Sequence, residues 1–76
     1  MANRECEFAS NLRAFRALRD LSQAELAERA GVDVTSIQKW ENGAYMPSLS
    51  NTVKLADALG VNMDALAGRV SLLDAH

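Results

Sequence analysis

Gln23 to Glu41 reads QAELAERAGVDVTSIQKWE, in which two short amphipathic segments are joined by Ala30-Gly31-Val32. Ser22 and Asp33 stand just before the two segments, and both residue types favour the N-terminus of a helix. Two helices joined by a turn of about 3–4 residues, often with a glycine, form a helix-turn-helix. The sequence therefore predicts this motif over residues 22–42, with a left-handed glycine ending its first helix.

Helices on both sides of the motif complete a predicted all-α domain over residues 1–68, followed by a short tail, residues 69–76. The apolar spacing predicts a first helix over about 5–19, and Ser48 and Asn62 are expected to begin helices that end at Gly60 and Gly68. The side chains expected in the core are Phe8, Leu12, Phe15, Leu18, Leu26, Ala27, Ala30, Ile37, Trp40, Leu49, Val53, Leu55, Ala56 and Leu59.

The composition fits one small globular domain. Of the 76 residues, 49% are apolar and 24% are charged, which is ordinary for a folded domain. No apolar run approaches the ~20 residues that a membrane span requires, and the polar segment from Met1 to Phe8 is unlike a secretory signal. We therefore expect a cytoplasmic protein without membrane contact.

The charge balance weighs against nucleic acid as a ligand without excluding it. The formal net charge is −2 and the isoelectric point is about 5.2, whereas nucleic-acid-binding domains usually carry a basic excess. The distribution of charge over the surface matters more than its sum. Arg13, Arg16 and Arg19 make the first predicted helix basic, and Lys39 lies in the second helix of the motif. We expect modest affinity per protomer and a reliance on dimerisation.

The residues that an enzyme would need are missing from this sequence. Cys6 and His76 are single and stand at opposite ends of the chain, so they offer neither a nucleophile with its base nor a metal-thiolate site. The four glycines fall at predicted helix ends instead of in a phosphate-binding loop. We therefore expect no enzymatic activity, no metal, no cofactor and no small-molecule ligand.

Beyond the motif itself, the chain resembles the helix-turn-helix family of phage repressors and Cro proteins, the xenobiotic-response-element group of bacterial transcriptional regulators. The resemblance covers about residues 15–66 and rests on Phe15-Arg16, Leu21-Ser22-Gln23, Glu25-Leu26-Ala27, Ala30-Gly31-Val32, Ile37, Trp40-Glu41-Asn42-Gly43, Pro47, Ala56, Ala58-Leu59-Gly60-Val61 and Leu66. It implies a compact, five-helix, lambda-repressor-like domain that binds double-stranded DNA, with the helix over about 33–42 in the major groove.

The resemblance also implies which side chains contact DNA. Thr35 and Lys39 match the positions that touch base edges, with Val34 and Gln38 beside them. A lysine suits the acceptors of guanine, and the methyl groups of valine and threonine suit the thymine methyl. Phosphate contacts are expected from Gln23, Ser36, Asn42, Arg19 and Tyr45. Two alternatives stay open: Gln23 can be a solvated first-turn residue, and Tyr45 can be a packed loop residue.

A further set of residues is expected to hold the motif together. In the family that this chain resembles, Arg16 pairs with Glu41 across the first and third helices. Ala27 lies four residues before the turn, where a larger side chain would push the two helices of the motif apart. Trp40 is expected in the core, since large aromatic side chains chiefly supply buried area. The residues with predicted structural roles are Arg16, Glu41, Ala27, Gly31, Ile37 and Trp40.

Three positions depart from the family pattern. Asp20 stands where the family often has glycine, and Thr52 occupies a position that leucine usually fills. The loop Ala44-Tyr45-Met46 lacks the basic residues that often precede the proline, which removes expected phosphate contacts. These departures affect the expected affinity and the packing of the fourth helix more than the fold.

Two functions compete on this evidence. The first is a sequence-specific transcriptional regulator, a repressor by resemblance, that binds a palindromic operator as a homodimer. Its dimer interface is predicted to comprise Met63, Leu66, Val70, Leu72 and Leu73, although the tail residues can equally fold back onto their own core. The second is an antitoxin or other interaction module that grips a partner protein, such as a toxin, and binds DNA only for autoregulation.

Overall fold

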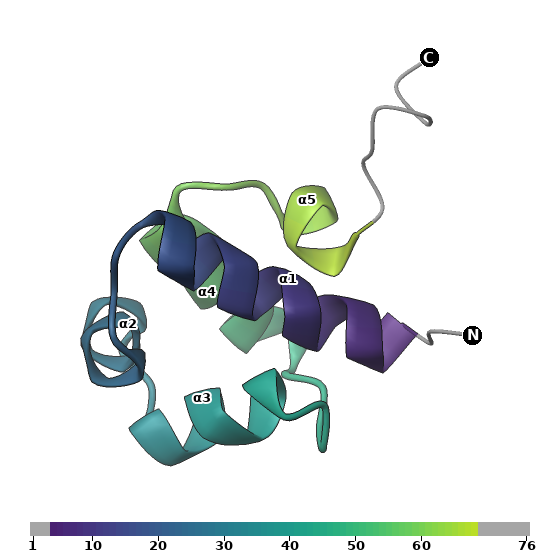
Figure 1. The fold of residues 1–76 in the computed structure, drawn as a ribbon, viewed down its shortest axis with the longest axis horizontal. Helices are drawn as coiled ribbons and strands as arrows, with labels where there is room; N and C mark the ends of the chain where they lie inside the picture. Colours follow the sequence, from purple (N-terminus) through teal and green to yellow (C-terminus); the bar gives the residue numbers. More distant parts are fainter. Residues whose placement is uncertain (1–3, 69–76) are drawn as a thin grey trace.

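The computed structural model describes residues 4–68, with side chains described from residue 7 onward, and contains five helices in that range. They are α1 (Arg4–Leu18), α2 (Gln23–Ala30), α3 (Val34–Glu41), α4 (Leu49–Leu59) and α5 (Met63–Ala67), and no strand occurs between residues 4 and 68 (Figure 1). The predicted all-α, five-helix fold is confirmed.

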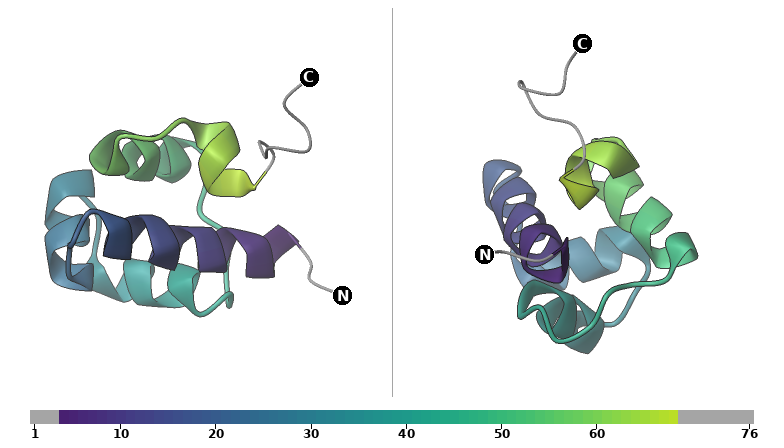
Figure 2. Two further views of the ribbon diagram at one scale, coloured as in Figure 1. Left: turned by 45° about the horizontal axis from the view of Figure 1, so that its top comes forward. Right: turned by 90° about the vertical axis from the view of Figure 1, so that its right-hand side faces the viewer.

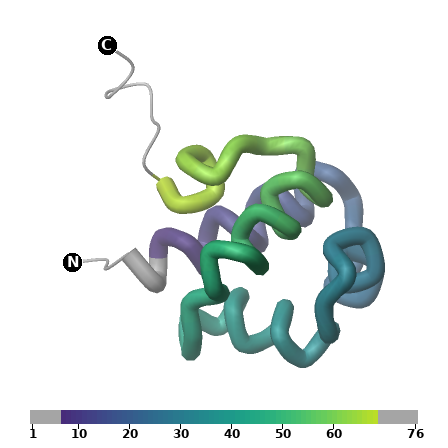
Figure 3. Tube along the Cα trace, turned by 180° about the vertical axis from the view of Figure 1, so that it is seen from behind, coloured from purple at the N-terminus to yellow at the C-terminus, as the bar shows by residue number. Residues whose placement is uncertain are grey.

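The first helix runs through the middle of the molecule and separates α3 from α5. It packs against α3 on one side and α5 on the other, as the turned view in Figure 2 shows. The second helix closes one end by packing against α3 and α4, and α4 also contacts α5. Figure 3 shows the same arrangement from behind, with α4 crossing in front of α1. One long face of α3 is therefore left at the edge of the domain.

A single apolar core fills the space between the helices. The largest fully buried side chains are Phe8, Leu12, Leu26, Ile37, Leu55, Leu59 and Leu66, and all of them except Leu66 were predicted in the core. Phe15 and Met63 are partly buried against this cluster. Leu21, in the turn between α1 and α2, is also buried, although the apolar periodicity did not mark it.

Three predicted core residues are instead exposed. Leu18, Leu49 and Val53 are exposed by 70%, 72% and 39%, respectively. A helix advances about 100° per residue, so Leu18 lies roughly 80° from Phe8 around α1 and has drifted off the buried face. On α4 the buried face is set by Leu55, Ala56 and Leu59. The same geometry turns Leu49 and Val53 toward solvent and leaves Thr52 half-buried.

Most of the predicted helix caps are present. The capping box of α2 is complete: the Ser22 amide donates to Glu25 Oε1 at 2.8 Å and the Glu25 amide donates to Ser22 Oγ at 3.0 Å. Ser48 and Asn62 cap α4 and α5 through their side-chain oxygens, at 3.1 Å and 2.7 Å. Asp33 differs, because its backbone is extended but its side chain makes no cap hydrogen bond. The first turn of α3 therefore lacks the side-chain cap that the sequence predicted.

Left-handed residues end the helices where the sequence placed them. Asp20, at a φ of 58°, is the single non-glycine residue with positive φ between residues 4 and 68. Aspartate tolerates this conformation better than most residues, so the glycine common at this position in the family is dispensable here. Gly31 has a φ of 73°, which separates α2 from α3 as predicted.

Polar side chains of α1 and its C-terminal turn tie the other helices to it. Asn11, Arg13 and Arg19 donate to main-chain carbonyls at the C-terminal ends of α5, α3 and α4, respectively. The bond from Asn11 is 3.2 Å long and the bond from Arg19 is 2.8 Å long. The last carbonyls of a helix have no partner within the helix and carry partial negative charge. These donors therefore stabilise the ends of all three helices and hold them in place against α1.

Some sequence predictions concern parts of the chain outside the described residues. The tail 69–76, with Val70, Leu72, Leu73 and His76, is among them. Between residues 4 and 68, no helix has the length and apolar character needed to cross a bilayer. The same described residues contain no group of three or more histidine, cysteine or acidic side chains arranged to hold a metal ion.

The capping box of α2 is expected to make the free energy of unfolding depend on pH. Hydrogen bonds to its carboxylate, first from the Ser22 main-chain amide and then from the Ser22 side chain, lower the pKa of Glu25. A carboxyl whose pKa is lower in the folded state stabilises the fold above its unfolded pKa, and this contribution is lost as the pH falls through the folded value. We predict that wild type is more stable than Glu25→Gln at pH 7 and that the difference shrinks toward pH 3.

Urea unfolding at a series of pH values measures this difference. Glu28→Gln is the matched control, because Glu28 lies on the same helix and takes no part in the capping box. A stability difference between wild type and Glu25→Gln that stays constant from pH 7 to pH 3 would contradict the assignment.

Candidate nucleic-acid interface

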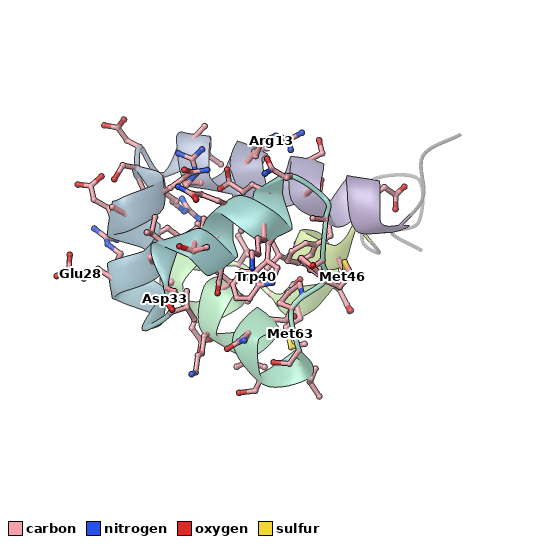
Figure 4. The ribbon with its side chains drawn as sticks, turned by 90° about the horizontal axis from the view of Figure 1, so that it is seen from below. Arg13, Glu28, Asp33, Trp40, Met46 and Met63 are labelled. Atoms are coloured by element: carbon pink, nitrogen blue, oxygen red, sulfur yellow. The ribbon has the colours of Figure 1, made fainter. Side chains whose placement is uncertain are left out.

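The third helix has one face in the core and one face in solvent. Ile37 and Trp40 are 0% and 6% exposed and anchor the helix from beneath. Trp40 is therefore a core residue, as predicted. The four residues predicted to contact bases all lie on the opposite face, and all are exposed: Val34, Thr35, Gln38 and Lys39. Figure 4 views the molecule from the side of α3, with Asp33 at its start and Trp40 toward its end.

The exposed face of α3 carries the chemical groups needed to distinguish base pairs. Lys39 supplies a cationic donor, Gln38 supplies a donor and an acceptor on one amide, and Val34 and Thr35 supply methyl groups. In the major groove, ammonium groups suit guanine, amides suit adenine, and methyl groups suit thymine. An isolated α-helix of this diameter also fits the width of that groove.

The helix is held in position by a close contact with α2. Ala27 is 4% exposed and belongs to the common core. Its carbonyl accepts hydrogen bonds from the amides of Gly31 and Val32, at 2.9 Å and 3.0 Å, so the turn between the two helices is closed by main-chain bonds. The predicted short, fixed connection of the motif is thus present.

A buried carboxylate joins the helices behind this face. Glu41 is 2% exposed and is the one polar or charged residue buried among the described side chains. The Arg16 guanidinium donates to it from Nε at 2.6 Å and from Nη2 at 3.1 Å. The pairing that the family resemblance implied is confirmed. The hydrogen bond to Glu41 raises the pKa of Arg16 above its ordinary value, so the guanidinium stays charged throughout the neutral range.

Further donors extend the network to three helices. Gln23, the first residue of α2, donates to Glu41 Oε1 at 3.1 Å. Arg13 donates to the main-chain carbonyl of Glu41, and Arg16 Nη1 donates to the carbonyl of Leu21 at 2.8 Å. The contacts of Arg13 and Gln23 were not predicted. For Arg13 the sequence did hold a signal: it lies three residues before Arg16 on α1, so the two side chains are neighbours on one side of that helix.

The residues predicted to contact phosphates do not all lie on one face. Ser36 and Asn42 belong to α3 and its C-cap, and Tyr45 is 60% exposed in the loop that follows. Gln23 stands beside them through its bond to the last residue of α3. Arg19 is different, because its guanidinium donates to the end of α4, which Figure 1 shows on the far side of α1 from α3. The structure therefore separates Arg19 from the other predicted phosphate contacts.

One residue that was predicted at the dimer interface is instead buried within the domain. Leu66 is 0% exposed and packs inside the core of its own protomer, so its side chain is not available at a surface. Its position on α5 directs it toward α1, which contacts that helix closely. Met63, by contrast, is only partly buried. Val70, Leu72 and Leu73 lie outside the described residues.

Comparison with known proteins gives a consistent result. Residues 12–66 match the helix-turn-helix family HTH_3. The chain is 44% identical over 48 residues to RstR, a cryptic phage CTXphi transcriptional repressor of Vibrio cholerae, covering 63% of this chain and 43% of RstR. It is 36% identical over 62 residues to the immunity repressor protein of Bacillus phage phi105, covering 82% of this chain and 43% of that repressor. The chain thus spans less than half the length of these two curated relatives.

A solved structure supports the likeness in three dimensions. The restriction-modification controller protein C.AhdI from Aeromonas hydrophila superposes with a TM-score of 0.79 at 35% sequence identity. The superposition covers 82% of this chain and 94% of that protein. The likeness therefore extends over nearly the whole of that controller protein.

The buried ion pair gives a prediction for stability. Glu41→Ala would leave Arg16, whose side chain is 22% exposed, without its carboxylate, and Gln23 without its acceptor. Removing one partner of a buried pair costs about 3–5 kcal/mol, and the partial exposure of the arginine favours the lower figure. We expect a loss of about 3 kcal/mol in the free energy of unfolding, measured by urea denaturation.

Two further variants test the cause of that loss. Glu28→Ala removes an exposed glutamate from a helix surface and is expected to change stability by no more than about 0.5 kcal/mol. In Arg16→Met/Glu41→Leu no unpaired charge remains, so this double variant should be more stable than Glu41→Ala alone. The assignment would be wrong if Glu41→Ala unfolded at the same urea concentration as wild type.

Proposed function

The chain belongs to the HTH_3 helix-turn-helix family of DNA-binding transcriptional regulators, which are not enzymes, and from this we propose that it binds a specific operator through α3. The observation that supports the proposal most directly is the division of α3 into two faces. Ile37 and Trp40 fix the helix to the core, so the opposite face is presented rigidly. A rigid face lowers the entropy that would be lost on binding.

We propose distinct roles for two groups of residues. Val34, Thr35, Gln38 and Lys39 read base edges in the major groove, with Lys39 directed at guanine. Phosphate contacts come from side chains on α3, at its C-terminal end and at the start of α2, which set the register without reading sequence. These are Gln23, Ser36 and Asn42. Gln23 retains one amide hydrogen beyond the one it gives to Glu41, which leaves it a donor for a phosphate.

We further propose that the protein acts as a homodimer on a palindromic operator. Two copies of α3 about one helical turn of DNA apart, ~34 Å, would read two half-sites. A dimer is favoured because one protomer offers few cations to DNA, and pairing doubles the number of phosphate contacts. The proposed interface comprises Met63, Val70, Leu72 and Leu73, whose apolar side chains lie near the C-terminal end of the chain.

The proposed function is tested by selecting the DNA fragments that the protein binds. The DNA offered is randomised duplex together with the region upstream of the protein's own gene. We expect wild type to enrich a palindrome whose binding weakens steeply with salt. In Thr35→Ala/Lys39→Ala the preference should be lost, because each direct base contact contributes about 1–3 kcal/mol of discrimination. Lys54→Ala is the matched control: it removes one exposed lysine from α4 and should keep the same preferred sequence.

The outcomes of this selection separate the competing functions. Failure of wild type to enrich any sequence at low salt would refute the stand-alone regulator. In that case an interaction module that needs a partner protein, such as a toxin, to bind DNA would be the better explanation. A preference that survives in Thr35→Ala/Lys39→Ala would instead show that α3 is not the reading helix.

The proposed interface makes a separate prediction about assembly. Two aspartates in the apolar contact would be buried without partners, so Leu72→Asp/Leu73→Asp should sediment as a monomer and bind the selected operator weakly. Leu49→Asp/Val53→Asp is the matched control, since it places the same charges on the exposed apolar side of α4. If the control becomes monomeric and the tail variant stays dimeric in analytical ultracentrifugation, the interface lies on α4.

A further inference from the structure

An aromatic ring in the loop after α3 lies against the cation of the proposed recognition face. The Lys39 Nζ atom is 5.5 Å from the centroid of the Tyr45 ring. An ammonium within about 6 Å of a ring face is attracted to the negative side of the ring's quadrupole. Both side chains are exposed, so neither is held by burial in the core. The contact therefore belongs to the surface that is proposed to meet DNA.

The backbone after α3 fixes this juxtaposition. The Gly43 amide donates to the carbonyl of Trp40 at 3.2 Å and the Ala44 amide donates to the carbonyl of Lys39 at 3.1 Å. Gly43 is left-handed, with a φ of 77°. This pair of bonds is the Schellman arrangement that turns the chain back over the last turn of a helix. Because the turn is bonded to Lys39 itself, the next residue, Tyr45, is delivered to the side of that lysine.

We propose that Tyr45 is a positioning residue for base recognition, whose ring holds the Lys39 ammonium over the exposed face of α3 and sharpens its preference for guanine. A free lysine has many rotamers and binds as a point charge to any nearby acceptor, phosphates included. A lysine held against a ring samples fewer of them and keeps donors free for a base. The inference rests on the proposed function, because it assigns Lys39 to a base edge.

A role for the ring of Tyr45 and a role for its hydroxyl predict different results in substituted proteins. A phosphate contact would use the phenolic hydroxyl as a donor, whereas attraction to an ammonium uses the ring face. Phenylalanine keeps the ring and loses the hydroxyl, and leucine keeps apolar bulk without a ring. Because Tyr45 is 60% exposed in a loop, neither substitution removes core packing. A change in thermal stability is therefore not expected from either variant.

The test compares wild type, Tyr45→Phe and Tyr45→Leu by NMR of the free protein and by selection and titration on DNA. We expect the Lys39 side-chain methylene protons of wild type and Tyr45→Phe to be shifted upfield by the ring, and the shift to vanish in Tyr45→Leu. On the selected operator, Tyr45→Phe should bind like wild type. Tyr45→Leu should bind about 2- to 5-fold more weakly, as expected for an exposed cation–ring contact. Tyr45→Leu should also tolerate replacement of the guanine that Lys39 is proposed to contact. Its affinity for random DNA should be unchanged.

Each other outcome overturns the inference in a recognisable way. If Tyr45→Phe loses affinity as Tyr45→Leu does, the hydroxyl acts and the ring does not. If wild type selects an operator and Tyr45→Leu has the same affinity and the same base preference, the positioning role alone is wrong. If adding Lys39→Ala weakens Tyr45→Leu as much as it weakens wild type, the two side chains are not coupled. If wild type selects no sequence at all, the proposed function fails and the inference fails with it.

Discussion

The carboxylate of Glu41 is the group on which the arrangement of the recognition helix depends. A carboxylate that is 2% exposed is tolerated in a core only when donors replace the water that it has lost. Here the donors are Arg16 from α1 and Gln23 from α2. Because Glu41 ends α3, the electrostatic requirement of one side chain is met only when three helices are correctly placed. Specific geometry, more than net stabilising energy, is what a buried ion pair supplies in this setting.

The same network explains why net charge is a poor guide to this surface. Three arginines suggest a basic patch in the sequence: Arg13, Arg16 and Arg19. Their guanidinium groups instead donate to other helices, to Glu41 and to carbonyls at helix ends. Arg16 is neutralised by its partner, and Arg13 and Arg19 face the partial negative charge of helix C-termini. Lys39 is the one cation among the four proposed base-contacting residues. A small excess of acidic residues elsewhere is therefore compatible with a surface that meets DNA.

Local signals in the sequence predicted the fold well, and long-range contacts were harder to predict. Caps and left-handed residues act through neighbours in the chain, so the helix boundaries could be found, although Asp33 does not cap with its side chain. The inward side of α4 was misjudged at Leu49 and Val53 because two apolar faces were possible and only contact with other helices chooses between them. In the candidate site, the outward residues of α3 followed from its periodicity and the family pattern. The contact between Tyr45 and Lys39 depends on how a loop folds back, which no periodicity encodes.

The separation of α3 into an anchored face and a free face has a consequence for how such proteins diverge. None of the four outward side chains belongs to the buried core, so replacing them changes the chemistry shown to DNA without creating cavities or unpaired charges. Surface substitutions of this kind usually alter stability by no more than about 0.5 kcal/mol. Mutation can therefore explore new target sequences at these positions while selection for folding acts on a different set of residues. Such a scaffold is free to change its regulatory target in single steps, each of which leaves a folded protein.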